Sequence, residues 1–189
     1  MELNKRIRSE LDNFIGKQKS CCKVGCSFCC YQTIEVINIE VNEIKNFLLN
    51  NIDEETKNKI LENLKEYFRF FDENTPNKTV LEAYDFINNF QDISLTKKTK
   101  CPLLIDNKCS IYESRPIACR IHIVEENPSL CEKEPYRDSS RPAIYIRQQI
   151  LELMKSKTEN AYILPLSYII AETLLPEKKL KSIERLFIS

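Results

Sequence analysis

The chain has 189 residues, a length that suits one domain with a substantial core. Its 42% apolar and 30% charged residues are close to the average of soluble globular proteins, which argues against wholesale disorder. Its 28 basic residues balance 28 acidic ones. The overall charge therefore favours neither nucleic acid nor an anionic membrane surface as a partner.

The sequence also lacks the signals of membrane insertion and secretion. No apolar run approaches the ~18 residues that a transmembrane helix needs. The N-terminal stretch MELNKRIRSELDNF is charged throughout and has no apolar core of a secretory signal. We therefore expect a single domain over residues 1–189, located in the cytoplasm, with no membrane association.

Helices are predicted on both sides of the first cysteines. Apolar residues recur at helical spacing before them, at Leu3, Ile7, Leu11, Phe14 and Ile15. Gly16 is a natural end for this helix. After the cysteines, TIEVI (33–37) is a short β-prone stretch. A helix near 40–50 then follows from apolar residues at Val41, Ile44, Phe47 and Leu48.

Two further helices are predicted before the second group of cysteines. Asp53 suits the N-cap of the first, and Pro76 breaks it because proline lacks an amide donor. Its inner face is expected to consist of Ile60, Leu64, Tyr67, Phe68 and Phe71. The second helix is expected to continue from Val80 through Tyr84 and Ile87 to about Phe90. LTKKTK (95–100) follows as a polar loop.

From residue 101 the pattern changes to short elements and loops. CPLLIDNKCSIY predicts a small β-hairpin that turns at 106–108, with a cysteine at the start of each arm. Pro116 suits the first turn of a short helix that carries Cys119. Beyond Cys131, EKEPYRDSSRP is expected to form a loop.

Three helices are predicted at the C-terminal end, from the spacing of three groups of apolar residues. These groups are Ile146, Ile150, Leu153 and Met154; Leu166, Ile169, Ile170 and Leu174; and Leu180, Ile183, Leu186 and Phe187. The predicted fold class is therefore mainly α, a single helical domain with a small β-hairpin and irregular cysteine-bearing loops.

The nine cysteines are the unusual feature of the sequence, and all of them lie in residues 21–30 and 101–131. A reducing cytosol makes metal binding or thiol chemistry a better explanation for them than disulfides. Short spacings let one turn of backbone present two thiolates to the same metal. Four thiolates suit tetrahedral zinc or the corners of an iron–sulfur cluster such as 4Fe–4S. Calcium and magnesium prefer oxygen.

The adjacent pair Cys29 and Cys30 sharpens this prediction. Neighbouring side chains point in different directions in most backbone conformations, so both thiols reach one metal ion only with difficulty. They serve two metals or two corners of a cluster more easily. We therefore predict more than one metal ion or a polynuclear centre, with a vicinal disulfide as the alternative.

The first cysteine loop has a local resemblance to one enzyme family. Cys22-x3-Cys26-x-Phe28-Cys29 is similar to the cluster-binding loop of radical S-adenosylmethionine enzymes. That family carries its loop after the first strand of an α/β barrel. Here a predicted helix precedes the loop, and βαβ alternation and glycine-rich cofactor motifs are missing.

A second resemblance spans residues 22–131. The matching motifs are Cys22-x3-Cys26-x2-Cys29-Cys30, Cys101-Pro102-Leu103-Leu104, Cys109-Ser110-Ile111-Tyr112, Arg115-Pro116 and Cys119-Arg120. In these residues the chain resembles the YkgJ-type cysteine-cluster proteins, also called the zinc- or iron-chelating CxxCxxCC family. The x3 gap after Cys22 departs from the x2 in that name, which leaves Cys21 as an alternative first ligand and otherwise as the spare thiol.

The resemblance implies a metal site but only hints at a reaction. Its implied metal ligands are Cys22, Cys26, Cys29, Cys30, Cys101, Cys109, Cys119 and Cys131. Similarity to the cluster region of flagellin lysine methylases hints at methyl transfer to a protein substrate. We thus expect an iron–sulfur or polynuclear centre with a redox or modification role and an unidentified protein partner. Non-enzymatic structural zinc binding and a partner-binding module remain alternatives.

Three residues around Cys119 are candidate supporting groups. Arg115 and Arg120 flank it, and their guanidinium groups could neutralise a thiolate-rich centre or donate to sulfur. They could equally bind an anionic substrate or pair with Glu113 and Glu125 at the surface. His122, the only histidine, could be a ligand or an acid–base group, or have no role at the site. No catalytic residue can be assigned.

Overall fold

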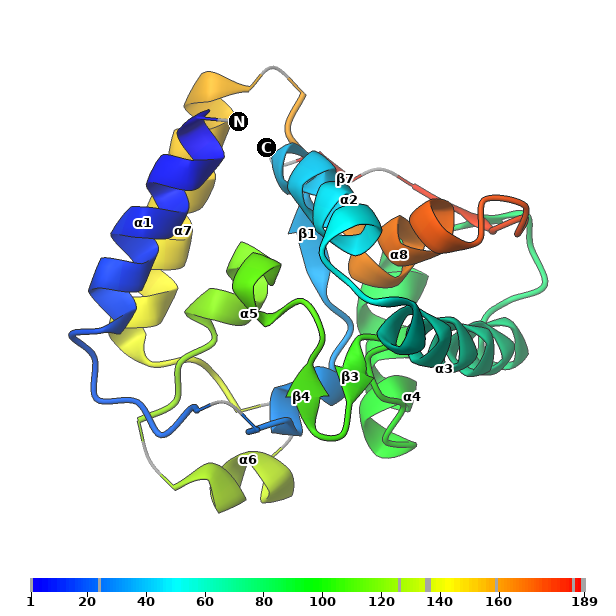
Figure 1. The fold of residues 1–189 in the computed structure, drawn as a ribbon, viewed down its shortest axis with the longest axis horizontal. Helices are drawn as coiled ribbons and strands as arrows, with labels where there is room; N and C mark the ends of the chain where they lie inside the picture. Colours follow the sequence, from blue (N-terminus) through cyan, green and yellow to red (C-terminus); the bar gives the residue numbers. More distant parts are fainter. Residues whose placement is uncertain are drawn as a thin grey trace.

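The computed structural model describes residues 2–23, 25–125, 127–134, 137–158, 160–184 and 186–187, with side chains described from Lys5 to Glu184. The predicted fold class is confirmed, because helices predominate and the sheets are small (Figure 1). In the part of the chain that is described, no helix is long and apolar enough to cross a membrane. The helical elements are α1 (Glu2–Ile15), η1 (Phe28–Tyr31), η2 (Asn38–Glu40), α2 (Val41–Asn50), α3 (Glu54–Asn74), η3 (Asp85–Phe90), α4 (Gln91–Thr96), η4 (Tyr112–Ser114), α5 (Ile117–Ile121), α6 (Pro128–Lys133), α7 (Arg141–Lys157) and α8 (Leu166–Leu174).

Short strands join segments that lie far apart in the sequence. The strands are β1 (Glu35–Ile37), β2 (Val80–Leu81), β3 (Leu104–Ile105), β4 (Lys108–Cys109), β5 (Tyr162–Pro165), β6 (Ser182–Ile183) and β7 (Leu186–Phe187). An antiparallel sheet has the order β1-β5-β7, with Val36 opposite Leu164. β2 pairs with β6 in parallel, and β3 with β4 in an antiparallel hairpin. The β-prone stretch at 33–37 and the hairpin are therefore confirmed.

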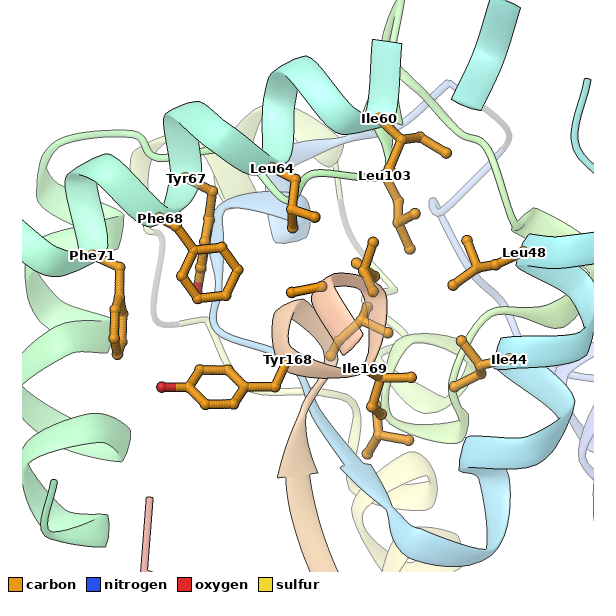
Figure 2. Close-up of a cluster of buried hydrophobic side chains, with 14 of the residues drawn as sticks. Ile44, Leu48, Ile60, Leu64, Tyr67, Phe68, Phe71, Leu103, Tyr168 and Ile169 are labelled. Carbon is orange, nitrogen blue, oxygen red and sulfur yellow. The ribbon is translucent and has the colours of Figure 1, made fainter. Parts of the chain in front are cut away.

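The main core lies along α3, as the sequence predicted. Asp53 caps this helix, because its carboxylate accepts a hydrogen bond from the Thr56 amide at 2.7 Å. The helix ends at Asn74, before Pro76. Its predicted inner face is buried, and Figure 2 shows these residues facing side chains of α2 and α8. The members of that face are Ile60, Leu64, Tyr67, Phe68 and Phe71.

A second apolar cluster joins α1, α5 and α7. The short helix α5 contacts both α1 and α7, and the three helices are seen on one side of the molecule in Figure 1. The buried residues of this cluster are Ile7, Leu11, Ile37, Ile117, Ile121, Ile123, Ala143, Ile150 and Met154. Ile117 and Ile121 of α5 belong to this cluster, whereas Cys119 of the same helix lines a cavity. Packing of the two isoleucines therefore fixes the position of the Cys119 thiol.

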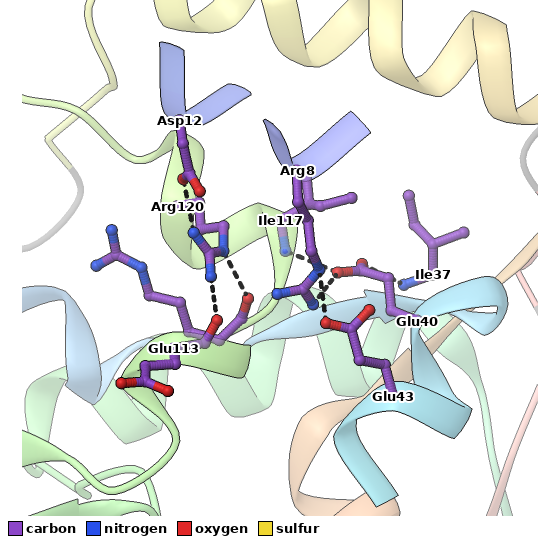
Figure 3. A network of polar contacts seen from close by, with 9 residues as sticks. Arg8, Asp12, Ile37, Glu40, Glu43, Glu113, Ile117 and Arg120 are labelled. Atoms are coloured by element: carbon purple, nitrogen blue, oxygen red, sulfur yellow. Dashed lines mark hydrogen bonds and ion pairs between the residues drawn. The ribbon is translucent and has the colours of Figure 1, made fainter. Parts of the chain in front are cut away.

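Charged contacts bind α1 to the rest of the fold (Figure 3). Arg8 Nε lies 3.2 Å from Glu43 Oε1, and Arg8 Nη2 lies 3.6 Å from Glu40 Oε1. Glu40 is 1% exposed, and its two carboxylate oxygens accept hydrogen bonds from the amides of Ile117 at 2.8 Å and Ile37 at 3.4 Å. One buried carboxylate therefore joins α1, α5 and the end of β1.

The helix predicted from Val80 to Phe90 is wrong at both ends. Val80 lies in β2, and Tyr84 is 67% exposed instead of facing the core. The helical segment continues past Phe90 through α4, after a π-helical stretch at η3. Within this stretch Phe86 and Phe90 are stacked, with ring centroids 6.0 Å apart, and both are buried. Val80 is instead paired with Ser182 of β6, a partner far away in the sequence that helical spacing could not reveal.

The predicted last helix, based on Leu180, Ile183, Leu186 and Phe187, is also wrong. The chain forms β6 and β7 there instead. Ile183 pairs with Leu81, and Phe187 pairs with Tyr162. Both strands are stabilised by partners far away in the sequence, so local periodicity could not reveal them.

Candidate metal centre

The first cysteine loop is anchored at both ends by backbone hydrogen bonds. The Cys21 amide donates to the Val124 carbonyl at 2.9 Å, and the Cys30 carbonyl accepts from the Cys101 amide at 2.7 Å. Between these points, Gly25 has a φ of +91°, a conformation that glycine adopts readily. The short helix η1 then presents Cys29 and Cys30. The loop is thus fixed against both later cysteine segments.

The hairpin β3–β4 holds Cys101 and Cys109. Asp106 and Asn107 form its turn with φ values of 49° and 59°, which these residue types tolerate. The Leu103 carbonyl accepts hydrogen bonds from the amide and the hydroxyl of Ser110, at 2.9 and 3.0 Å. Cys101 precedes β3, but Cys109 is the last residue of β4 and not the first residue of its arm, which corrects the prediction.

The remaining two predicted ligands lie on short helices. Cys119 is on α5, which starts after Pro116 as expected. Cys131 is on α6, which extends to Lys133. The loop that was expected directly after Cys131 therefore begins later than predicted. Asn127 caps α6 by accepting from the Ser129 amide at 2.9 Å, and Pro128 occupies the first turn. This Asn-Pro start was the available helix signal. α6 packs against η1, so Cys131 returns to the first loop.

The cysteines gather around two neighbouring cavities. A cavity of about 290 Å³, which we call the inner cavity, has six cysteines in its wall: Cys26, Cys29, Cys30, Cys101, Cys109 and Cys119. A second cavity of about 20 Å³, the outer cavity, has four in its wall: Cys22, Cys26, Cys29 and Cys131. All eight predicted ligands therefore lie on these two cavities. The thiols line the walls without converging, because no three cysteine, histidine or acidic side chains of the described residues are arranged to hold a metal ion.

The structure has no disulfide among its nine cysteines, so the vicinal pair is present as two thiols. Burial raises the pKa of Cys101 to about 12 and raises the pKa of Cys119 well above its usual value. The hydrogen bond between Cys30 and Cys29 lowers the pKa of Cys29 to about 7 and raises the pKa of Cys30. Cys30 thus stays protonated and donates its S–H to the sulfur of Cys29. Without a cation most of these thiols remain protonated, and a metal that binds them displaces protons.

Arg115 supplies a positive charge at the wall of the inner cavity. Its guanidinium carbon lies 4.2 Å from the centroid of the Tyr112 ring. Its Nε atom is buried and has no hydrogen-bond partner among the described residues. Burial raises the pKa of Cys109 and Cys119, and the charge of Arg115 opposes that rise in both. Arg115 therefore favours thiolates in this cavity.

Arg120, the other flanking arginine, is directed away from the cysteines. It pairs with Asp12 at 2.7 Å and donates to the carbonyls of Glu113 and, at 3.2 Å, Arg115 (Figure 3). It is not among the residues that line either cavity. Its contacts join α1 to α5. The sequence allowed an ion pair with the Glu113 side chain, but Arg120 donates to the Glu113 backbone carbonyl instead.

His122 lies beside both cavities. Its Nδ1 is 3.1 Å from the Ser139 hydroxyl, and its carbonyl accepts from the Cys22 thiol at 3.8 Å. Burial, with the charge of Arg147, lowers the pKa of His122, so the ring is neutral. Glu35 and Arg147 also line the inner cavity. Nothing in the local sequence indicated these two residues, since they come from β1 and α7.

The donor set determines which cofactors fit. The side chains concentrated at the cavities are thiols, which suit zinc, iron or iron–sulfur clusters and not calcium or magnesium. Iron–sulfur clusters are held by four cysteine thiolates, and structural zinc by up to four. Eight thiols therefore fit a centre with more than one metal atom. Their assignment as ligands stays a prediction.

Comparison with known proteins gave one match. A family model described as "Putative zinc- or iron-chelating domain", with the name CxxCxxCC, matches residues 20–144. This range contains all nine cysteines, begins after α1 and extends into α7. No curated protein and no solved structure matches the chain.

Proposed function

The chain belongs to the CxxCxxCC family of zinc- or iron-chelating domains, and we propose that it carries a polynuclear, thiolate-ligated metal centre of the iron–sulfur type. The proposed ligands are Cys22, Cys26, Cys29, Cys30, Cys101, Cys109, Cys119 and Cys131. Under this proposal the protein acts in the cytoplasm, in electron transfer or in cluster-dependent modification of a protein partner.

The observation that carries this proposal is the cysteine lining of the inner cavity. Six thiols from the first cysteine loop, the hairpin β3–β4 and α5 line a space of about 290 Å³. Liquid water occupies about 30 Å³ per molecule, so this space accommodates a group of several atoms. A lone tetrahedral zinc ion with four sulfur ligands would use neither the volume nor the surplus thiols.

The residues of the chain have separate tasks in this centre. An iron–sulfur cluster supplies one-electron transfer and depends for its potential on charge and hydrogen bonds near its sulfurs. Arg115 contributes a positive charge that offsets the thiolates, while metal binding displaces the proton by which Cys30 is bonded to Cys29. The hydrogen bond between the Cys101 amide and the Cys30 carbonyl keeps the two cysteine segments together before the centre forms.

Structural zinc is the second candidate, and the burial of the thiols favours it. Closed zinc sites with four cysteines contribute to folding and leave no open position for a substrate. Here Cys101 and Cys119 are partly buried, and burial raises the pKa of both thiols.

Anaerobic purification followed by measurement of iron, acid-labile sulfide and zinc distinguishes the two functions. The proposal predicts iron and sulfide in the protein, with broad visible absorbance from thiolate-ligated iron. A colourless protein that holds only zinc would contradict the proposal and support the structural role.

A further inference from the structure

The helix α1 packs chiefly against α5, the short helix that carries Cys119. Ile7 and Leu11 of α1 are 3% and 2% exposed. They belong to the same apolar cluster as Ile117 and Ile121, which flank Cys119 on α5. Cys119 itself lines the inner cavity. The packing of α1 therefore acts on the helix that holds this thiol at the cavity.

Charged contacts join α1 to both ends of α5 (Figure 3). In the last turn of α5, Arg120 pairs with Asp12 of α1 at 2.7 Å. At the start of α5, the Ile117 amide donates to the buried carboxylate of Glu40 at 2.8 Å. The same carboxylate lies 3.6 Å from Nη2 of Arg8, which is on α1. Departure of α1 would remove the positive charge beside Glu40 and the partner of Arg120 together.

The buried charge of Arg8 weakens this contact. Its side chain is only 9% exposed, yet none of its side-chain nitrogens has a hydrogen-bond partner among the described residues. The nearby carboxylates of Glu40 and Glu43 offset only part of the cost of burying a charge, because full compensation needs good hydrogen bonds as well. A helix held in this way is released more easily than one held by apolar packing alone.

The first cysteine loop is anchored independently of α1. Residues 16–20 separate α1 from Cys21, whose amide donates to the Val124 carbonyl at 2.9 Å. The loop therefore begins at a point fixed by its own hydrogen bond. Undocking of α1 from α5 does not require this loop to move.

We propose that α1 is a latch on α5, which holds Cys119 at the inner cavity while docked and exposes its thiol when it undocks. The latch residues are Ile7, Arg8, Leu11 and Asp12. Because Cys119 is a proposed ligand, undocking also promotes release of the metal. This second step rests on the proposed function, whereas the exposure of Cys119 does not.

Alkylation of the metal-free full chain by iodoacetamide, measured at each cysteine by mass spectrometry, tests the latch without any metal. Leu11→Ala should raise the rate at Cys119 at least ~10-fold, because loss of a fully buried leucine strongly weakens packing. Asp12→Asn should raise it less, up to ~5-fold, because partly exposed ion pairs contribute little. The rate at Cys101 should not change in either variant, since the hairpin holds this residue.

Two matched controls lie outside the latch. Leu81→Ala removes an equally buried leucine from the main core. Asp72→Asn removes an aspartate of α3 that lies 3.8 Å from Lys178 Nζ. Both should keep the wild-type rate at Cys119. Equal increases in Leu11→Ala and Leu81→Ala would mean that Cys119 is exposed by unfolding of the whole chain, which would overturn the latch. A wild-type rate at Cys119 in folded Leu11→Ala would overturn it as well.

Milder variants protect the test against misfolding. If either leucine variant is not folded by circular dichroism, Ile7→Val and Ile44→Val replace the pair. Ile7→Val should then raise the rate at Cys119 by ~2- to 10-fold, as the smaller loss of packing implies. Ile44→Val, in the main core, should leave this rate unchanged.

Metal release separates the latch from the proposed function. In protein purified anaerobically with its metal, Leu11→Ala should lose the metal to a chelator faster than wild type, and Leu81→Ala should not. Faster alkylation with unchanged metal release would overturn the coupling of the latch to the metal. A chain that binds no metal would overturn the proposed function, while the alkylation rates would still support or overturn the latch.

Discussion

The Cys101 amide donates a hydrogen bond to the Cys30 carbonyl, with nitrogen and oxygen 2.7 Å apart. This bond joins the two cysteine segments, although α2, α3 and α4 lie between them in the sequence. Closing such a long loop costs conformational entropy, which grows slowly with loop length. Contacts with the core along α3 help to offset this entropy loss. Asn63 of α3 donates to the Pro102 carbonyl at 3.1 Å and so holds the start of the hairpin against the helix.

Removal of the metal should loosen the cysteine segments and leave the main core intact. The thiols line cavities, and the short helices α5 and α6 have little internal stability of their own. Hydrogen–deuterium exchange should therefore rise in residues 21–32 and 127–134 after chelation. Exchange in α3 should stay unchanged, which provides the internal control. Equal increases in α3 and in the cysteine loop would mean that the metal holds the entire fold together.

Arg115→Gln should weaken metal binding. The change removes the charge that favours thiolates at the inner cavity but keeps a polar, though shorter, side chain. Substitution of groups that support metal ligands usually lowers affinity by about 10- to 100-fold. Competition with a metal chelator would measure this loss. Arg69→Gln, at an exposed position on α3, is the control. An affinity equal to that of wild type would exclude Arg115 from the centre.

His122→Ala should retain the metal. The contact of His122 with Cys22 is made by its backbone carbonyl, and its Nδ1 faces Ser139. Neither contact makes the ring a ligand, so metal per chain should equal that of wild type. Loss of one metal equivalent in a folded variant would add His122 to the ligand set.

The buried Glu40 should make stability depend on pH. Burial raises the pKa of this carboxyl from 4.5 to about 7, against the opposing effects of the Ile117 amide and Arg8. Between these values the folded protein binds more protons than the unfolded chain, so the free energy of unfolding should fall as pH rises through this range. The full effect is about 3 kcal/mol, since each pKa unit corresponds to about 1.4 kcal/mol.

Glu40→Gln tests this prediction. In urea unfolding, the free energy of unfolding of this variant should no longer fall between pH 5 and pH 7. The variant should also be less stable than wild type by roughly 1–3 kcal/mol, because one buried backbone amide is left without an acceptor. Glu62→Gln, at an exposed position on α3, should keep the wild-type profile. A Glu40→Gln profile parallel to that of wild type would show that other groups determine the pH dependence.

Helices with one buried face were predictable from the sequence. The residues of α3 show why, since a clear N-cap, five apolar residues at helical spacing and a proline after the end all agree. Such signals are local, and the structure follows local signals where packing does not oppose them. The helix that carries Cys119 was predictable for the same reason, from Pro116.

Two-residue strands with distant partners, namely β2, β6 and β7, were not predictable, whereas the hairpin β3–β4 was predictable from its local turn residues. Ile183 has the spacing of a helix with Leu180, but its partner is Leu81, a hundred residues earlier in the sequence. A single sequence does not contain that pairing. The same limit applies to the site, because the position of Cys119 depends on the packing of α5 against α1 and α7. The sequence did not distinguish the roles of Arg115 and Arg120. In the structure Arg120 pairs with Asp12, whereas Arg115 lines the inner cavity.

The most direct test of the account is X-ray absorption spectroscopy at the metal edges of the anaerobically purified chain. The first shell of the metal should consist of sulfur, and an iron–sulfur centre should add short iron–iron scattering. First shells dominated by nitrogen or oxygen would contradict the claim that these eight cysteines hold the metal.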